Sequence, residues 1–255
     1  MMDQTDTPAA TTIDAKAVGA VGPPLYGRLM KAIATGHTFG NRVRMIKLPL
    51  IFTDPQLYAA AIGQFFWLTE TLEIALARYA DHPMIQRIQD LGLVVTPGFA
   101  ADLKQMHGAN WRDKVERDRT SATSAYCEII SCASPVELVA AAFILYGALV
   151  VGGGKQTQAK VRKVFPQYDH NLFDVADDIK VARQRFKSTF TAIGREWPEH
   201  FQTLECEAAR FMALNNTVVL SIRCWGRRAT AVTVGVFAAS LALVLARRWT
   251  KGTMV

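Results

Sequence analysis

Cysteine is scarce in this chain. Four of its 255 residues are cysteines, and no two of them have CxxC spacing. Structural zinc sites and redox-active cysteine pairs usually contain that spacing, and a cytosolic protein keeps its thiols reduced. The sequence therefore argues against a zinc cluster and against disulfide cross-links.

The first 24 residues have no apolar core of the kind that signal peptides need. They contain three aspartates and no arginine, whereas transit peptides are rich in arginine and poor in acid. No internal repeat or long linker divides residues 25–222, which have the length of one ordinary domain. We expect residues 1–24 to be a disordered leader and residues 25–222 to form a single domain that stays in the cytosol.

Acidic residues are absent from residues 223–255, although this stretch holds six basic ones. The whole chain has a net charge of +7, so subtracting those six leaves +1 for residues 1–222. Proteins that bind nucleic acid usually carry their basic residues over the folded domain. We therefore expect no nucleic-acid partner.

Charge is missing altogether from residues 229–246, which lie between two pairs of arginines. A helix of this length reaches about 27 Å, close to the roughly 30 Å of bilayer hydrocarbon. The stretch has no polar stripe, which a buried core helix, the alternative, normally shows. We predict a basic linker at 223–228, a transmembrane anchor at 229–246 and a short basic tail at 247–255. Such an anchor suits the endoplasmic reticulum or the mitochondrial outer membrane.

Alternating strand patterns are also absent, and helical periodicity covers most of the domain. Asp54 followed by Pro55 is a typical helix start. The predicted fold class is all-α. The predicted helices are Leu25–His37, Gln56–Tyr79, Met84–Leu91, Phe99–His107, Val136–Phe165, Leu172–Ile193 and Pro198–Ile222.

Three consecutive glycines, Gly152, Gly153 and Gly154, interrupt the helix predicted at 136–165. Each glycine inside a helix costs about 1 kcal/mol relative to alanine, so the run should bend it. A phosphate-binding P-loop is excluded because Lys155 is followed by glutamine and not by serine or threonine. Two explanations stay open: close packing against another helix, or backbone lying against a flat ligand.

The stretch VELVAAAFILYGALVVGGGK resembles the distal-helix signature of heme oxygenases, whose glycines bend over the heme, and LMKAIATGHTFGNRV resembles their proximal helix. The resemblance covers roughly residues 25–222 and implies a single-domain helical bundle. Eukaryotic members also have a C-terminal membrane anchor. Further similar segments are FFWLTETLEIAL, AADLKQMHGANWRDKV, ARQRFKSTFTAI and EAARFMALNNTVVL.

The resemblance places His37 at the position of the proximal iron ligand, with heme as both cofactor and substrate. It places Arg183 and Lys187, four residues apart on one helical face, where basic groups hold the heme propionates. A solvated basic face is the alternative for that pair. Lys31 is near a further basic position of the family but one residue out of register.

Three other positions match the heme pocket of the family. Phe143 falls where the family often has a tyrosine, so it keeps the ring and loses a hydroxyl near the propionates. Met212 and Asn215 match the contribution of the final helix. The remaining histidines, His82, His107, His170 and His200, are predicted to be exposed and have no assigned role.

The distal helix departs from the family. An aspartate there orders the water that supplies a proton during oxygen activation, and its aligned position is Leu149, with Ala148 replacing the neighbouring glycine. No Asp or Glu lies between Glu137 and Asp169, so a shift of register does not restore the carboxylate. Water and backbone carbonyls at the glycine bend are the alternative source of a proton chain.

Two functional hypotheses follow, and a helical scaffold without heme is a weaker third. The first is a membrane-anchored heme oxygenase that uses O2 to cleave heme to biliverdin, carbon monoxide and iron. A NADPH-dependent cytochrome reductase on the same membrane would supply its electrons. The second is a heme-binding or heme-sensing protein of the same fold, catalytically impaired because Leu149 makes the distal side apolar.

Overall fold

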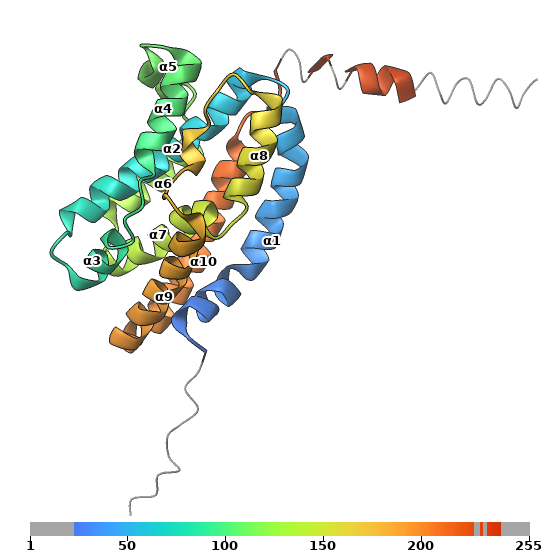
Figure 1. Cartoon of the computed structure of the whole chain (residues 1–255). Coiled ribbons are helices and arrows are strands. Elements are labelled where there is room, and N and C mark those ends of the chain that lie inside the picture. The colour runs from blue at the N-terminus through green and yellow to red at the C-terminus, as the bar shows by residue number, and fades with distance from the viewer. Residues whose placement is uncertain (1–22, 227–229, 232–233, 241–255) are drawn as a thin grey trace, which may run out of the picture.

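The computed structural model describes residues 23–226, 230–231 and 234–240, and this part of the chain contains helices and connecting segments but no strand (Figure 1). The predicted all-α class is confirmed. The elements are α1 (Leu25–Ile51), α2 (Pro55–Arg78), α3 (Pro83–Gln89), α4 (Thr96–His107), α5 (Trp111–Arg117), α6 (Ser121–Cys132), α7 (Pro135–Val150), α8 (Gly154–Val164), η1 (Asn171–Phe173), α9 (Ile179–Glu196), η2 (Pro198–His200) and α10 (Phe201–Ser221).

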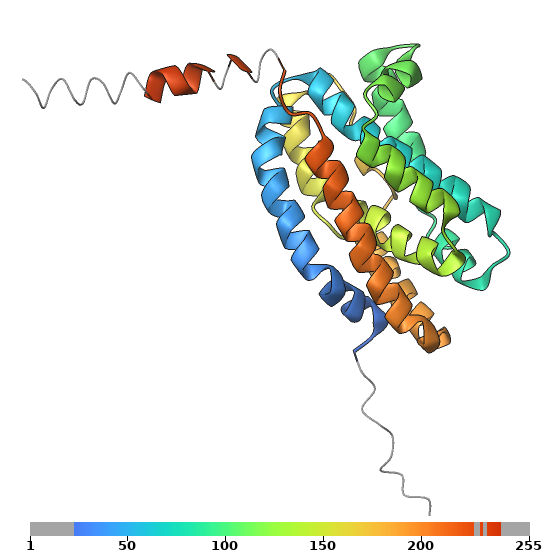
Figure 2. The same cartoon turned by 180° about the vertical axis from the view of Figure 1, so that it is seen from behind.

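Helix α1 is twice as long as predicted, because its second half packs on α10. The two helices lie side by side in both views (Figures 1 and 2). Asn216 of α10 donates through Nδ2 to the carbonyl of Gly36 at 2.8 Å. A Cβ at Gly40 would lie 2.3 Å from the Asn216 side-chain oxygen, so glycine is needed for this close approach. Pro49 lies in the last turn of α1 and has no amide proton to donate to the helix, which ends two residues later at Ile51.

The other predicted helices were only partly right. The segment predicted as a helix from Leu172 begins as one only at Ile179, where Asp178 accepts the amide protons of Lys180 and Val181. The bend predicted at the glycine run is confirmed, because residues 136–165 form two helices, α7 and α8, joined at the glycines. Helices α5 and α6 were missed because they are short and rich in polar residues.

Helix α7 lies in the middle of the bundle, and every residue of 138–146 is buried. Its start is fixed by a capping box in which Ser134 and Glu137 each accept a backbone amide proton of the other. Within the described residues, no single helix is both long and apolar enough to cross a membrane, and only the bent pair α7–α8 reaches that length and composition.

The leader predicted at 1–24 lies largely outside the described residues, since only residues 23 and 24 are described. Of the anchor predicted at 229–246, residues 230–231 and 234–240 are described. Of the linker at 223–228, residues 223–226 are described, and they pack on the domain because a Cβ at Gly226 would lie 3.3 Å from Leu57. The tail at 247–255 lies wholly outside.

Candidate functional site

A cavity of about 360 Å³ lies between α1 and the bend that joins α7 to α8. Helices α2, α4, η1, α9 and α10 supply the rest of its lining. We call two parts of the lining the proximal wall and the distal wall. The proximal wall is Met30, Ile33, His37, Asn41, Arg44 and Leu48 of α1. The distal wall is Gly147, Ala148, Leu149, Val151, Gly152 and Gly153.

The proximal wall is one stripe of α1, because its members recur every three or four residues. His37, Asn41 and Arg44 form a row along this stripe. The Asn41 side-chain nitrogen lies 3.4 Å from His37 Nδ1, and Arg44 donates to the Asn41 side-chain oxygen. The wall therefore presents a histidine, an amide and a guanidinium to the cavity.

The surroundings of His37, an exposed side chain, favour its neutral form. Partial burial and the positive charge of Arg44 lower the pKa of its imidazole below the ordinary value. A neutral imidazole has a free lone pair on one ring nitrogen, which is what an iron ligand requires. The structure thus places the predicted ligand in the cavity lining in a suitable charge state.

The distal wall is built on the bend at the glycine run, where α8 turns away from α7 by 51°. The amides of Val151 and Gly152 both donate to the carbonyl of Gly147, at 2.9 Å. A Cβ at Gly152 would lie 2.6 Å from the carbonyl oxygen of Ala148. Gly152 and Gly153 are exposed, so bare backbone faces the cavity and lets a flat ligand approach closely.

No aspartate or glutamate occurs among the described residues that line the cavity. Leu149 is half-buried in the distal wall. Its apolar side chain occupies the position at which the resemblance predicted a carboxylate. The missing carboxylate is therefore not replaced by one from another element within the described lining. The residues there that carry hydroxyl groups are Tyr26, Tyr58, Thr69 and Thr157.

Tyr58 is a lining residue that the sequence did not single out. Its hydroxyl is buried and has no hydrogen-bond partner within the described part of the chain. Burial, together with the nearby Asp102 carboxylate, raises the pKa of this hydroxyl, so it stays protonated. The ring packs edge-on against Phe52 and lies beside Phe165. Tyr58 is therefore a hydrogen-bond donor that keeps its proton.

The predicted propionate residues flank the cavity without belonging to its lining. Arg183 Nε donates to the carbonyl of Val150, at the end of α7, at 3.3 Å. Lys187 Nζ lies 5.9 Å from the ring centre of Tyr26, which does line the cavity. Both side chains are half-buried on α9. They are close enough to the cavity edge to meet carboxylates that extend from it.

The other predicted pocket residues divide into two groups. Phe143, Met212 and Asn215 line the cavity, and Phe143 stacks against Phe186 of α9. Lys31 is outside the lining, because it follows Met30 and so points about 100° away from the stripe. It is exposed and, with Arg28, lowers the pKa of Glu205 on α10.

The prediction that the remaining histidines are exposed was wrong for His107 and His170, which are 8% and 0% exposed. His170 adopts a left-handed backbone, φ 59°, and its Nε2 lies 2.9 Å from the Phe165 carbonyl oxygen. Asp102 holds the segment that directly follows His170. The Asp102 carboxylate accepts the amide protons of Asn171 and Leu172, at 2.7 and 2.9 Å.

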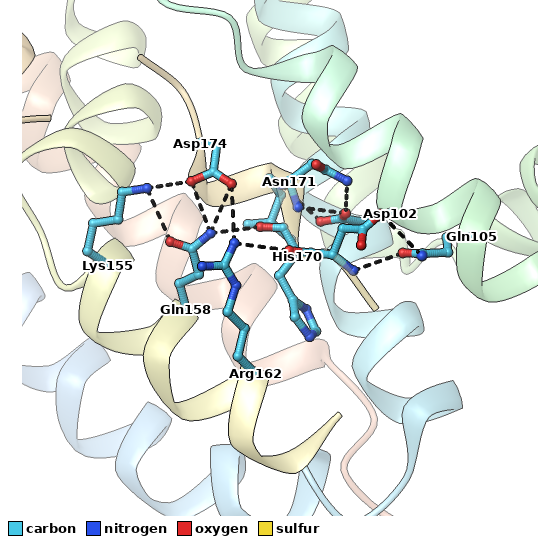
Figure 3. Close-up of polar contacts among 10 residues, drawn as sticks. Asp102, Gln105, Lys155, Gln158, Arg162, His170, Asn171 and Asp174 are labelled. Atoms are coloured by element: carbon cyan, nitrogen blue, oxygen red, sulfur yellow. Dashed lines mark hydrogen bonds and ion pairs between the residues drawn. The ribbon is translucent and has the colours of Figure 1, made fainter. Parts of the chain in front are cut away.

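The hydrogen bonds to Asp102 hold residues 171–173 in place. This segment forms one end of the cavity, because Leu172 and Phe173 belong to the cavity lining. On the other side, Asp174 pairs with Lys155 of α8 at 2.5 Å (Figure 3). Gln158 of α8 donates to both the Asp174 carboxylate, at 3.0 Å, and the His170 carbonyl, at 3.1 Å. The segment that leads from α8 to α9 is therefore fastened to α8 and to α4 at once.

A sequence model of a protein family, Heme oxygenase, matches residues 24–219. Among individual proteins, the chain is 24% identical to heme oxygenase 1 of Nostoc sp., over 133 residues that cover 51% of this chain and 55% of that protein. It is also 24% identical to heme oxygenase 1 of Synechocystis sp., over 59% of this chain and 61% of that protein. The chain thus matches less than two thirds of the length of these two relatives.

Solved structures agree with the fold. Heme oxygenase 2 of Chlamydomonas reinhardtii, solved without heme, is 26% identical with a TM-score of 0.74, over 80% of this chain and all of that one. Heme oxygenase-1 of Synechocystis sp., solved in complex with heme, is 21% identical with a TM-score of 0.68, over 85% of this chain and 99% of that one.

Proposed function

The chain belongs to the heme oxygenase family, and we propose that it binds heme between its proximal and distal walls and cleaves it to biliverdin, carbon monoxide and iron. One observation carries the proposal. A neutral histidine on α1 and a bare glycine bend after α7 line the same cavity. A ligand for iron and a surface for a flat ring are thereby brought to one place.

The residues present fit a heme. His37 would ligate the iron, and Arg183 and Lys187 would bind the propionates at the cavity edge through charge-assisted hydrogen bonds. The exposed backbone at Gly152 and Gly153 would lie against the ring. When bound, heme supplies the iron at which O2 is reduced and the meso carbon that is oxidised and leaves as carbon monoxide.

The protein's own part in the reaction is to deliver protons and to keep bulk water out. With no carboxylate in the described lining, protons would arrive through ordered water held by backbone carbonyls at the bend. The hydroxyls of Tyr58 and Thr157 would offer hydrogen bonds to that water in the same lining. The apolar side chains of the distal wall exclude other water and so protect the reacting oxygen from loss.

A heme-binding or heme-sensing protein is the second candidate, and one observation favours it. Leu149 and the whole described lining lack the carboxylate that would order a proton relay. A positioned general acid typically contributes about 10²–10⁴-fold to rate, so its loss is large enough to abolish useful turnover. In that case the cavity would hold heme without consuming it.

A single-turnover experiment separates the two candidates. The full chain in detergent, with one equivalent of ferric heme, is mixed in air with ascorbate or with a NADPH-dependent cytochrome reductase. A heme oxygenase loses the Soret band and yields extractable biliverdin and carbon monoxide. A binding protein keeps the Soret band and yields neither. Free heme treated in parallel is the control for uncatalysed oxidation.

Electrons would come from a NADPH-dependent cytochrome reductase on the same membrane, and residues 229–246 would anchor the chain there. The outer surface of α1 supports this proposal. The helix has five basic residues and no acidic one, and Met45 and Ile46 are each 71% exposed. Lys47 donates to the Ile222 carbonyl at 2.7 Å, so this surface lies beside the point where the chain leaves the domain.

The membrane proposal has its own test. Deletion of residues 229–255 should move the protein from the membrane fraction to the supernatant of cells that express it. The endoplasmic reticulum and the mitochondrial outer membrane are the two proposed locations, with the folded domain in the cytosol. A full-length chain that is already in the supernatant would contradict the anchor and leave the heme site unaffected.

A further inference from the structure

The point where the chain leaves the folded domain is close to the uncharged stretch 229–246. Gly226 packs on the domain, since a Cβ there would lie 3.3 Å from Leu57. The amide of Thr230 donates to the carbonyl of Gly226 at 2.8 Å, which is the pairing of one helical turn. At about 1.5 Å of rise per residue, Thr230 is only about 6 Å along the chain from the packed glycine. If the stretch enters a bilayer, the domain surface around Gly226 must lie on the lipid headgroups.

That surface exposes large apolar side chains. In both views the chain leaves the domain beside the end of α1 (Figures 1 and 2). Lys47 of α1 joins the two there, because its Nζ donates to the carbonyl of Val219 at 3.0 Å, near the end of α10. We call the exposed side chains at this place the exit surface, and they are Arg42, Met45, Ile46, Leu220, Arg223 and Trp225.

The charge of this region has one sign. Residues 41–53 and 216–226 together hold four basic residues and no acidic one. Asp54, the acid that follows, is engaged in capping α2, and Glu116 of the neighbouring α5 is paired with Arg119. Exposed apolar side chains among basic ones are typical of a surface that lies in the interface of an anionic bilayer.

Two other occupants fit the exit surface less well. The described part of the uncharged stretch does not fold back to cover it, because Val234, Val236 and Phe237 are themselves exposed. A second copy of the chain would bring the same basic residues face to face across a symmetric contact, which like charges oppose. An anionic lipid surface meets both the apolar and the basic side chains.

We propose that the exit surface docks on an anionic bilayer and fixes how the domain sits on the membrane. This inference rests on the proposed membrane anchor and does not depend on heme. Leu48 and Ile222 line the cavity next to exit-surface residues, so docking holds that end of the cavity beside the lipid. A surface of this kind binds reversibly by itself, since stable attachment takes a second signal. Deletion of residues 229–255 should therefore still release the protein.

Hydroxyl-radical footprinting of the full chain with lipid vesicles tests the docking. Methionine is readily oxidised where water reaches it, so Met45 reports on the exit surface. Met30, which is also exposed and lies about 22 Å away along α1, is the internal control. Oxidation of Met45 should be lower with vesicles that contain phosphatidylserine than with pure phosphatidylcholine vesicles, and Met30 should not change. Arg42→Gln should lower the ratio of covered to uncovered Met45 about fivefold, the contribution of one basic side chain near an anionic surface.

A matched pair of variants separates docking from a general loss of apolar surface. Ile46→Glu should leave Met45 equally reactive with both kinds of vesicle. Ile74→Glu is the same change at an exposed isoleucine near the far end of α2, and it should behave like the parent. Equal responses in the two variants would overturn the proposal. So would a Met45 that is covered without vesicles, which would assign the exit surface to a second copy or to the chain's own tail.

Flotation of the same vesicles reports on the anchor separately. A chain that floats with them but leaves Met45 equally reactive with both lipids keeps the anchor and overturns the docking. A chain whose Met45 is covered by phosphatidylserine vesicles but which does not float with neutral ones keeps the docking and overturns the anchor. A chain that does neither contradicts both.

Discussion

The proximal and distal walls of the cavity differ in polarity. The proximal wall belongs to a helix with five basic residues, and it presents His37, Asn41 and Arg44. The distal wall continues a helix that is buried along residues 138–146, and it presents small and apolar side chains and bare backbone. One wall can therefore bind iron, and the other can accept a flat ring without offering it an acid.

The difference separates binding from turnover. Heme binding would depend on His37 and on the shape of the cavity between the two walls. Proton delivery depends on the distal wall, where Leu149 occupies the position of the expected carboxylate. The first two experiments below each change one wall and measure how heme binding or turnover responds.

His37→Ala should have the largest effect, because it removes the only candidate ligand on the proximal wall. Ferric heme affinity should fall by about 100-fold or more, since even the outer partners of metal ligands are worth about 10–100-fold. Optical titration of the full chain measures it. Added imidazole should restore the spectrum by filling the space left. Unaltered affinity would place the ligand elsewhere.

Leu149→Asp restores an acid to the distal wall and should leave heme affinity nearly unchanged. If proton delivery limits turnover, the single-turnover rate should rise by about 100-fold, the low end of general acid catalysis. Leu149→Asn, which has the same shape and no ionisable group, is the control. An equal gain from both variants would mean that polarity matters and not the proton.

The bend of the distal wall should be sensitive at one glycine and not at its neighbour. At Gly152 a Cβ would lie 2.6 Å from the Ala148 carbonyl oxygen, whereas at Gly153 the nearest atom is 4.0 Å away. Gly152→Ala should lower the free energy of unfolding by about 1–3 kcal/mol, and Gly153→Ala should change it by less than about 0.5 kcal/mol. Urea unfolding measures both. Equal costs would show that the bend does not depend on Gly152.

The smallest effect concerns the ion pair between Arg28 of α1 and Glu205 of α10. The hydrogen bond from Arg28 lowers the pKa of Glu205 below its ordinary value. Such a group stabilises the fold above its ordinary pKa of about 4.3, and this contribution disappears as the pH falls through the lowered value. Both side chains are partly exposed, so the contribution is at most about 1 kcal/mol.

Unfolding of the parent and of Glu205→Gln at several pH values tests this pair. The parent should be the more stable protein near neutral pH, and the two should converge in acid. High salt should reduce the gap, because exposed charges are screened. If the parent stayed more stable than Glu205→Gln in acid, the difference in stability would not come from this ion pair.

The sequence predicted the parts of the fold that have a local signal. The Ser134-Pro135 start and the glycine run mark both ends of α7, and helical periodicity marks α2. Helix α6 also has such a signal, because Thr123, Tyr126, Cys127 and Ile130 are all buried at helical spacing. Its serines and threonines hid that pattern. The second half of α1 had no local signal, because it is helical through contacts with α10, which is distant in the sequence.

The site was predictable to a similar degree. A resemblance found His37 and the glycine bend, and helical spacing could have excluded Lys31, which follows the lining residue Met30. The burial of Tyr58 and His170 could not be predicted from the sequence. Their burial depends on packing against Phe165, and no local pattern predicts a contact across more than a hundred residues of chain for Tyr58.

Resonance Raman spectroscopy of the ferrous heme complex tests the central claim most directly, namely that the proximal wall holds heme iron through His37. The account predicts an iron–histidine stretching band in the full chain and its loss in His37→Ala, with return of an iron–imidazole band when imidazole is added. A parent complex without that band, or a band that survives in His37→Ala, would contradict it.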